Sequence, residues 1–105
     1  DVIEGCRLIM ERGPNNGYQA YNIGRDDLRS TEEIAKLVCQ IAGKPTSLIQ
    51  IVDPPKKLLT KVKNASFEKA LKDLGYESKI PVEEGIRRTI EWQRQFVLNR
   101  FTERE

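Results

Sequence analysis

The 105-residue sequence predicts an α/β fold that is mostly helical, with two or three short strands. Three observations lead to this prediction. Apolar residues recur at helical spacing in four segments, two short runs of branched or aromatic residues lie between them, and glycine or proline closes most of the elements. Two strands separated by a helix can pair in parallel, but so small a sheet is marginal on its own. The pattern therefore suggests a part of a larger protein.

The first helix is predicted over residues 2–12, where apolar side chains recur at helical spacing. They are Val2, Ile3, Cys6, Ile9 and Met10. The Gly-Pro-Asn-Asn-Gly stretch at 13–17 tolerates the turn conformations that end a helix. Residues 18–23 are rich in aromatic and β-favouring types, and they predict a short strand that ends at Gly24.

The start of the second helix has the sharpest local signal in the chain. Ser30 and Glu33 match a capping box, in which the hydroxyl accepts a first-turn N–H and the carboxylate accepts the N–H of the cap residue. The Gly-Lys-Pro sequence at 43–45 ends this helix. Residues 48–52 are a branched apolar run that predicts a second, buried strand.

Two more helices are predicted in the second half. Ser66 can cap a short helix that ends at Gly75, and Pro81 suits the first turn of the last helix. Trp92 and Phe96 lie four residues apart on that helix, a spacing that favours packing in the core. The tail at 99–105 is expected to fray.

Composition excludes several classes of function. The sequence has no histidine and no CxxC pair, which excludes Ser-His-Asp and Cys-His catalysis and argues against a zinc site. Its net charge of +2 is too small to indicate nucleic acid by itself. No apolar run approaches the roughly 20 residues of a membrane-spanning helix, and no secretory signal opens the sequence. A cytoplasmic location is expected, with Cys6 and Cys39 as buried, reduced side chains.

Four segments, in register over nearly the whole chain, carry a resemblance to a known family. They are DVIEG at 1–5, YNIG at 21–24, the NAS…KDLGY stretch at 64–76 and VEEGIRRTIEW at 82–92. Together they resemble the C-terminal region of the extended short-chain dehydrogenases/reductases, which include nucleotide-sugar epimerases and dehydratases. The resemblance covers about the last third of a family member.

The resemblance implies that residues 1–98 are the sugar-nucleotide-binding portion of a Rossmann-type enzyme whose dinucleotide-binding domain is absent from this chain. The glycines form no dinucleotide fingerprint. None of the three tyrosines, Tyr18, Tyr21 and Tyr76, has the family's lysine four residues later. We therefore expect no catalytic residue in the chain and no bound cofactor, with NAD or NADP serving the parent protein.

The resemblance also implies where the substrate binds. Family members place an arginine in the loop before the D-x-S motif, near the nucleotide diphosphate. Here that loop has no arginine, so Lys56, Lys57 and Lys61 are the candidate substrate-binding residues, together with Arg25 after the Gly24 turn. Lysine can hold a phosphate only as a point charge. The alternative interpretation is that these side chains are simply solvated.

Two classes of function remain open. The first is the substrate-binding part of an NAD(P)-dependent nucleotide-sugar epimerase or 4,6-dehydratase, inactive alone. Its partners would be a nucleotide-diphosphate sugar and the missing Rossmann domain, and the parent could form a homodimer. The second is a stand-alone module whose Lys56–Lys63 loop meets an acidic partner or nucleic acid. The lack of aromatic residues among these lysines disfavours nucleic acid.

Overall fold

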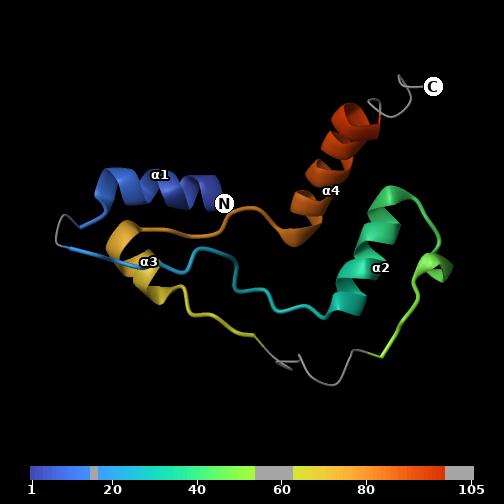
Figure 1. Ribbon diagram of the computed structural model, residues 1–105, viewed down its shortest axis with the longest axis horizontal. Coiled ribbons are helices and arrows are strands. Elements are labelled where there is room, and N and C mark those ends of the chain that lie inside the picture. Colours follow the sequence, from blue (N-terminus) through green and yellow to red (C-terminus); the bar gives the residue numbers. More distant parts are fainter. Residues whose placement is uncertain (15–16, 54–62, 99–105) are drawn as a thin grey trace. The chain divides into compact units, whose positions relative to one another are not determined.

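The computed structural model describes residues 1–14, 17–53 and 63–98, which form helices joined by turns and extended segments (Figure 1). The chain divides into two compact units. The first comprises residues 1–28 and 56–80, and the second comprises residues 29–55 and 81–105. Each unit is therefore built from two stretches that are far apart in the sequence. In the described part of the chain, no helix has the length and apolar character needed to cross a bilayer.

The first unit packs helix α1 (Val2–Arg12) against helix α3 (Glu68–Leu74) (Figure 1). Its core is small, and Tyr21 and Ile23 pack against it from the extended chain. The buried side chains are Leu8, Ala70, Leu74 and Tyr76. Gly5 makes the close approach possible, because a Cβ at this position would lie 2.6 Å from the Cγ2 atom of Ile23.

Side chains of the α3 region hold the extended segment at 18–24 in place. Lys69 donates from Nζ to the carbonyl oxygen of Ala20 at 3.0 Å, and its ammonium lies 4.7 Å from the centre of the Tyr21 ring. The Tyr21 hydroxyl donates to Asp73 at 3.2 Å. These bonds satisfy single groups of the extended segment without building a ladder.

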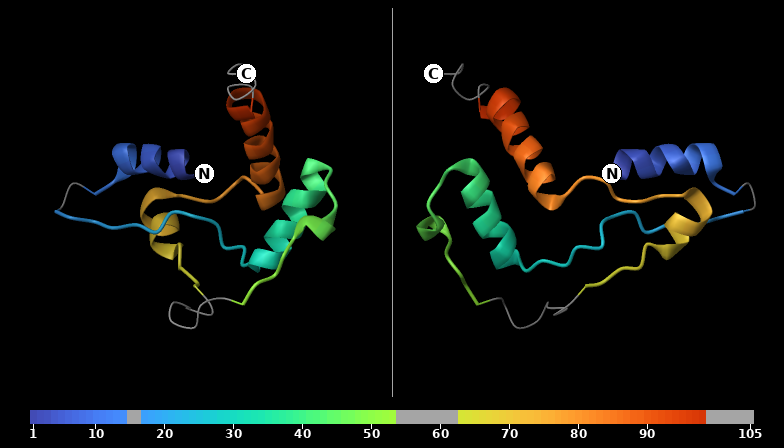
Figure 2. Two further views of the ribbon diagram at one scale, coloured as in Figure 1. Left: turned by 45° about the vertical axis from the view of Figure 1, so that its right-hand side comes forward. Right: turned by 180° about the vertical axis from the view of Figure 1, so that it is seen from behind.

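The second unit packs helix α2 (Thr31–Ala42) against helix α4 (Val82–Trp92), as Figure 2 shows from two further sides. A 3₁₀ helix, η1 (Thr46–Leu48), follows α2, and a π-helix, η2 (Gln93–Leu98), continues α4. The predicted capping box is confirmed. The Ser30 hydroxyl accepts the Glu33 N–H at 3.1 Å, and the Glu33 carboxylate accepts the Ser30 N–H at 2.7 Å.

All four predicted α-helices are present, with small shifts at their ends. The third begins at Glu68, where the Ser66 hydroxyl accepts the backbone N–H at a long 3.4 Å. Gly43 and Gly75 end their helices with φ of 68° each, the left-handed conformation that favours glycine. The π-helix at the end of α4 was not predicted. The tail at 99–105 lies outside the described residues.

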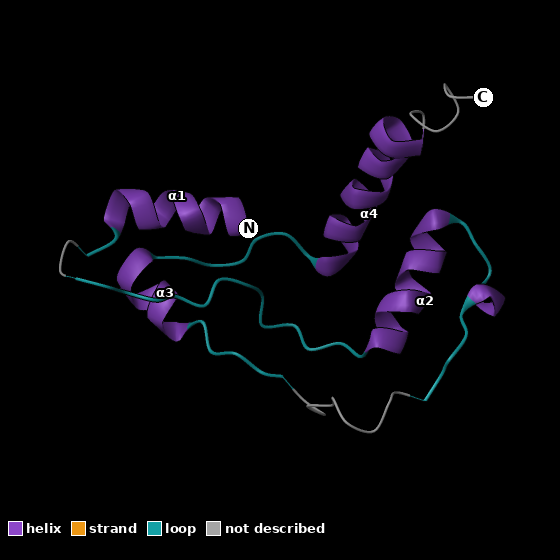
Figure 3. Cartoon of the chain, in the orientation of Figure 1, coloured by secondary structure: helices purple, strands orange, loops and turns teal. Residues whose placement is uncertain are grey.

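The α/β prediction is wrong, because the residues with described placement contain helices and no strand (Figure 3). Residues 18–23 are extended but unpaired, and the segment at 48–52 is the end of a 3₁₀ turn followed by extended chain. A ladder requires a partner strand about 4.8 Å away, and neither segment has one within its own unit among the described residues. The Rossmann-type architecture that the resemblance implied is thus not what the described residues form.

The burial predicted for several apolar side chains is also wrong. Cys6 is exposed and Cys39 is only partly buried. The α1 face that carries Cys6 also exposes Ile3 (86%) and Met10 (81%), because α1 packs through its other side, where Gly5 and Leu8 lie. Trp92 and Phe96 form a ring pair with centroids 6.2 Å apart, yet each stays about half exposed. Helical spacing identified the apolar faces but not which of them would be covered.

Candidate functional site

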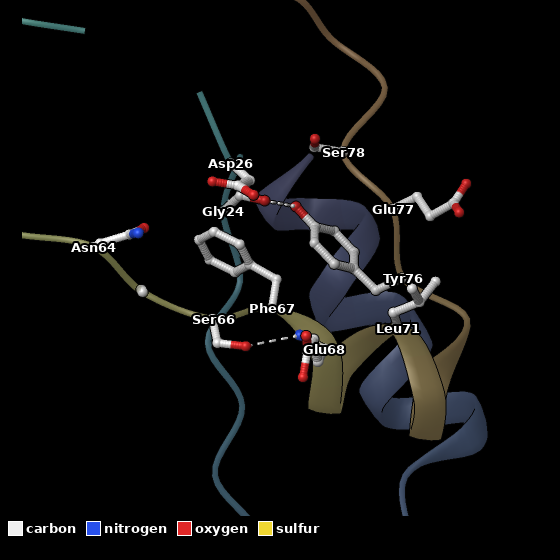
Figure 4. Close-up of a pocket in the computed structure, with 11 residues that line it drawn as sticks. Gly24, Asp26, Asn64, Ser66, Phe67, Glu68, Leu71, Tyr76, Glu77 and Ser78 are labelled. Atoms are coloured by element: carbon white, nitrogen blue, oxygen red, sulfur yellow. Dashed lines mark hydrogen bonds between the residues drawn. The ribbon is translucent and has the colours of Figure 1, made fainter. Parts of the chain in front are cut away.

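The first unit contains a polar pocket of about 530 Å³ where the extended segment after Tyr21 meets the start of α3 (Figure 4). Three short stretches of chain contribute its walls, one from each side of α3 and one from the segment that follows α1. The lining residues are Gly24, Asp26, Asn64, Ala65, Ser66, Phe67, Glu68, Leu71, Tyr76, Glu77 and Ser78. The volume is in the usual range for a small-molecule site.

Two aromatic side chains meet at Gly24 and form the apolar part of this pocket. A Cβ on Gly24 would lie 3.0 Å from Cε1 of Phe67, so the ring edge is in direct contact with the glycine. The Tyr76 hydroxyl donates to the Gly24 carbonyl oxygen at 2.9 Å, as Figure 4 shows. The Tyr76 ring is buried, whereas Phe67 is half-buried. The missing side chain of Gly24 makes room for the Phe67 ring, whereas the bond from Tyr76 uses only the backbone.

Burial raises the pKa of the Tyr76 hydroxyl, although the hydrogen bond to Gly24 acts in the opposite direction. The hydroxyl therefore remains protonated at neutral pH, which lets it serve as the donor of that bond. Tyr76 is the tyrosine among the described lining residues, and the residue four positions after it is Ile80 and not lysine. Its geometry fits a structural role rather than an acid or base.

The polar part of the pocket is rich in oxygen acceptors. Asp26, Glu68 and Glu77 supply carboxylates, and Ser66, Ser78 and Asn64 supply hydroxyl and amide groups. Among the described residues that line it, the charged ones are these three acids. Within the described ranges, no three side chains of metal-ligating type gather closely enough to hold a metal ion. The arrangement can accept hydrogen bonds from a neutral or cationic ligand.

Of the four predicted substrate-binding residues, the structure describes only Arg25. Lys56, Lys57 and Lys61 lie outside the described residues. Arg25 belongs to the first unit, where Nη1 donates to the Ile80 carbonyl oxygen at 3.2 Å and Nε lies 3.6 Å from a carboxylate oxygen of Asp27. Arg25 adjoins the pocket in sequence without lining it. These contacts attach Arg25 to the chain at Ile80, the last residue of the first unit.

Residues that were interpreted as structural prove to line the pocket as well. Gly24, which was interpreted as the residue that ends a strand, is in its walls, and so is Asn64 of the NAS segment. Asn22 has a structural role, since its amide donates to the Ser66 carbonyl oxygen at 3.2 Å. Asp26, Phe67 and Ser78 were not singled out at all. The available signal was that YNIG and NAS, two segments of the resemblance, meet here.

The second unit has an apolar groove of about 590 Å³ between α2, α4 and η2. Arg94 lies at this groove and donates to the Ala42 carbonyl oxygen at 2.9 Å. The lining residues are Val38, Ala42, Val82, Gly85, Ile86, Thr89, Ile90, Gln93, Arg94 and Leu98. Among these described residues Arg94 is the charged one, and most of the others are apolar.

The chain is thus a helical protein with a polar pocket in its first unit, and two curated proteins are similar to it in sequence. The chain is similar to the Arabidopsis thaliana trifunctional UDP-glucose 4,6-dehydratase/UDP-4-keto-6-deoxy-D-glucose 3,5-epimerase/UDP-4-keto-L-rhamnose-reductase RHM2, with 27% identity over 96 residues. Arabidopsis RHM1, described by the same three activities, is also 27% identical over 96 residues. Each similarity covers 90% of this chain and 14% of the relative.

The chain thus spans about a seventh of the length of the curated relatives it matches. No family model matches the sequence. No solved structure matches it either. The similarity is distant, and it relates the chain to nucleotide-sugar dehydratases, epimerases and reductases.

Proposed function

We propose that this chain is the substrate-binding part of an NAD(P)-dependent nucleotide-sugar epimerase or 4,6-dehydratase, and that it is inactive by itself. The similarity to the two trifunctional enzymes, which extends over nine-tenths of the chain, is the observation that carries the proposal. The parent would oxidise a sugar hydroxyl, rearrange the keto intermediate and return the hydride from the same cofactor. The residues of this chain would bind and enclose the substrate.

The diphosphate of the substrate would be held by the cations predicted from the sequence. Lys56, Lys57 and Lys61 would act as point charges, and Arg25 would lie nearby on the first unit. Arg25 is included in this set because it directly follows Gly24, a residue of the pocket wall. Its bond to Ile80 orients the guanidinium before any ligand arrives.

The test is calorimetric titration of UDP-glucose onto the 105-residue chain at low salt. Charge-assisted hydrogen bonds contribute about 1.5–3 kcal/mol each, so changing Lys56, Lys57 and Lys61 to alanine should weaken binding roughly tenfold or more. The matched control changes three lysines that the structure shows to be exposed, Lys44, Lys72 and Lys79, and removes the same charge. Equal effects of the two triple variants would reject the loop as a specific site.

A second measurement addresses the predicted inactivity. The purified chain, supplied with NAD or NADP and UDP-glucose, should give no keto sugar and no change in cofactor absorbance. Tyr18, Tyr21 and Tyr76 all lack the lysine partner four residues later that would prepare them for proton transfer. Turnover under these conditions would contradict the proposal, because the chemistry would then belong to this chain.

A further inference from the structure

The Asp27 carboxylate lies at the guanidinium group of Arg25, a cation that the proposed function assigns to the diphosphate. We infer that Asp27 competes with the phosphate for this guanidinium, so that Arg25 stays paired within the chain until a ligand displaces the carboxylate. The inference rests on the proposed function and adds to it a residue that lowers the affinity of the phosphate site. Asp27 acts on the ligand through Arg25, and it is therefore a positioning residue.

The two contacts of Arg25 involve different atoms of its guanidinium group. Nη1 donates to the Ile80 carbonyl oxygen at 3.2 Å, and Nε lies 3.6 Å from a carboxylate oxygen of Asp27. A guanidinium holds a phosphate most specifically through two parallel N–H donors. These donors come either from Nη1 with Nη2 or from Nε with Nη2. Each such pair thus has one nitrogen in contact with Ile80 or Asp27, and a two-pronged phosphate contact must compete with one of them.

The contact with Asp27 is the weaker of the two. Its N···O separation of 3.6 Å is longer than that of an ordinary hydrogen bond, whereas the bond to Ile80 at 3.2 Å is within the normal range. Ile80 is itself held in place, because its N–H donates to the Asp1 carboxylate. A phosphate should therefore displace Asp27 and accept from Nε and Nη2 of Arg25, while the bond to Ile80 keeps the guanidinium in position.

The strengths of these interactions determine the size of the effect. The Arg25 and Asp27 side chains are 35% and 25% exposed, and an ion pair open to solvent changes an equilibrium by a factor of about five at most. A charge-assisted hydrogen bond to a phosphate contributes roughly tenfold or more. The phosphate therefore displaces Asp27, but the pairing lowers its apparent affinity by about two- to fivefold.

The experiment is a double-mutant cycle with UDP as the ligand, measured by calorimetric titration of the 105-residue chain at low salt. Asp27→Asn should bind UDP about two- to fivefold more tightly than the unaltered chain. In the Arg25→Ala background the same substitution should bring no gain, because competition requires the guanidinium. Simple repulsion between Asp27 and phosphate would instead give an equal gain in both backgrounds. Glu11→Gln, which removes a paired carboxylate of α1 in the same unit, is the charge-matched control and should leave UDP affinity unchanged.

NMR of the arginine Nε–H groups tests the displacement in the unaltered chain, independently of whether the variants fold. The Arg25 Nε–H signal should shift when UDP is added, whereas that of Arg7, which donates to Glu4 on α1, should not. If UDP binds but the Arg25 signal is unmoved, or if Asp27→Asn brings no gain or an equal gain in both backgrounds, the inference is wrong and the proposed function stands. Failure of UDP to bind any of these chains would overturn the proposed function, and the role of Asp27 with it.

Discussion

The carboxylate of Asp1 accepts the backbone N–H of Ile80, with N···O distances of 3.3 Å to one oxygen and 3.2 Å to the other. The N–H of Lys79 donates to the same carboxylate at 3.0 Å. One side chain thus joins the start of α1 to the last residues of the first unit, 79 positions away in the sequence. Capping of α1 is not its role, since Asp1 makes no side-chain bond to the first turn of that helix.

This relationship predicts the effect of Asp1→Ala. The partly buried N–H of Ile80 would lose its acceptor, which should cost about 1–2 kcal/mol. Amide hydrogen exchange by NMR is the direct readout, and exchange at Ile80 should accelerate about tenfold. Asp53→Ala, which removes an exposed carboxylate of the second unit, is the control and should leave Ile80 unchanged. Unaltered protection in the Asp1 variant would show that another group closes the unit.

The capping box of α2 predicts a loss of stability in Ser30→Ala. The variant removes the acceptor for the Glu33 N–H, and such losses cost about 1 kcal/mol. Trp92 fluorescence during urea unfolding reports on this unit, because α4 packs against α2. Thr31→Ala, at the next and equally exposed position, should change stability by less than about 0.5 kcal/mol. Similar losses in both variants would argue against the cap.

The contact between Gly24 and Phe67 predicts a coupled pair of substitutions. Gly24→Ala would place a Cβ 3.0 Å from the Phe67 ring, and overpacking of this kind costs about 1–3 kcal/mol. Phe67→Leu shortens the side chain at the contact, so the double variant should be more stable than the sum of the two single effects predicts. A double-mutant cycle by chemical denaturation measures this coupling. Strict additivity would mean that the ring does not press on residue 24.

The hydrogen bonds from Arg87 and Arg88 predict a low pKa for the Glu84 carboxyl group. Hydrogen bonds from these two guanidinium groups lower the pKa of the Glu84 carboxyl to about 2, from 4.5 for the free side chain. A depressed folded-state pKa means that this contribution to stability is fully present above about pH 4.5. It is lost as the pH falls toward 2. Because the Glu84 side chain is still 30% exposed and its charge is screened by solvent, we expect the effect on overall stability to be small.

The measurement for Glu84 is a carbon-13 NMR titration of its carboxyl group. In the unaltered chain the midpoint should lie near 2, and in the Arg87→Gln, Arg88→Gln double variant it should rise toward 4.5. Arg7→Gln is a suitable control, because it disrupts the equivalent pair with Glu4 on α1 in the other unit. If the Glu84 midpoint is the same in the double variant as in the unaltered chain, the two arginines are not the cause of its low pKa.

Local signals in the sequence predicted the helices well. The Ser30 and Glu33 pair marked the start of α2, and Gly43 and Gly75 marked two helix ends, because capping and left-handed glycine involve atoms only a few residues apart. The strands were predicted wrongly for the complementary reason. A run such as 48–52 favours extended chain, but a strand exists only if another segment pairs with it, and that is a long-range condition.

By itself, the sequence determined the positions of the α-helices, the absence of histidine-based catalysis and the similarity to nucleotide-sugar enzymes. Only the tertiary structure decided which apolar faces are covered, and that Gly24, Phe67 and Tyr76 would meet beside Asp26. Periodicity records that a face is apolar, whereas burial depends on what packs against it. The pocket joins residues more than 50 positions apart, so no local pattern could have shown it.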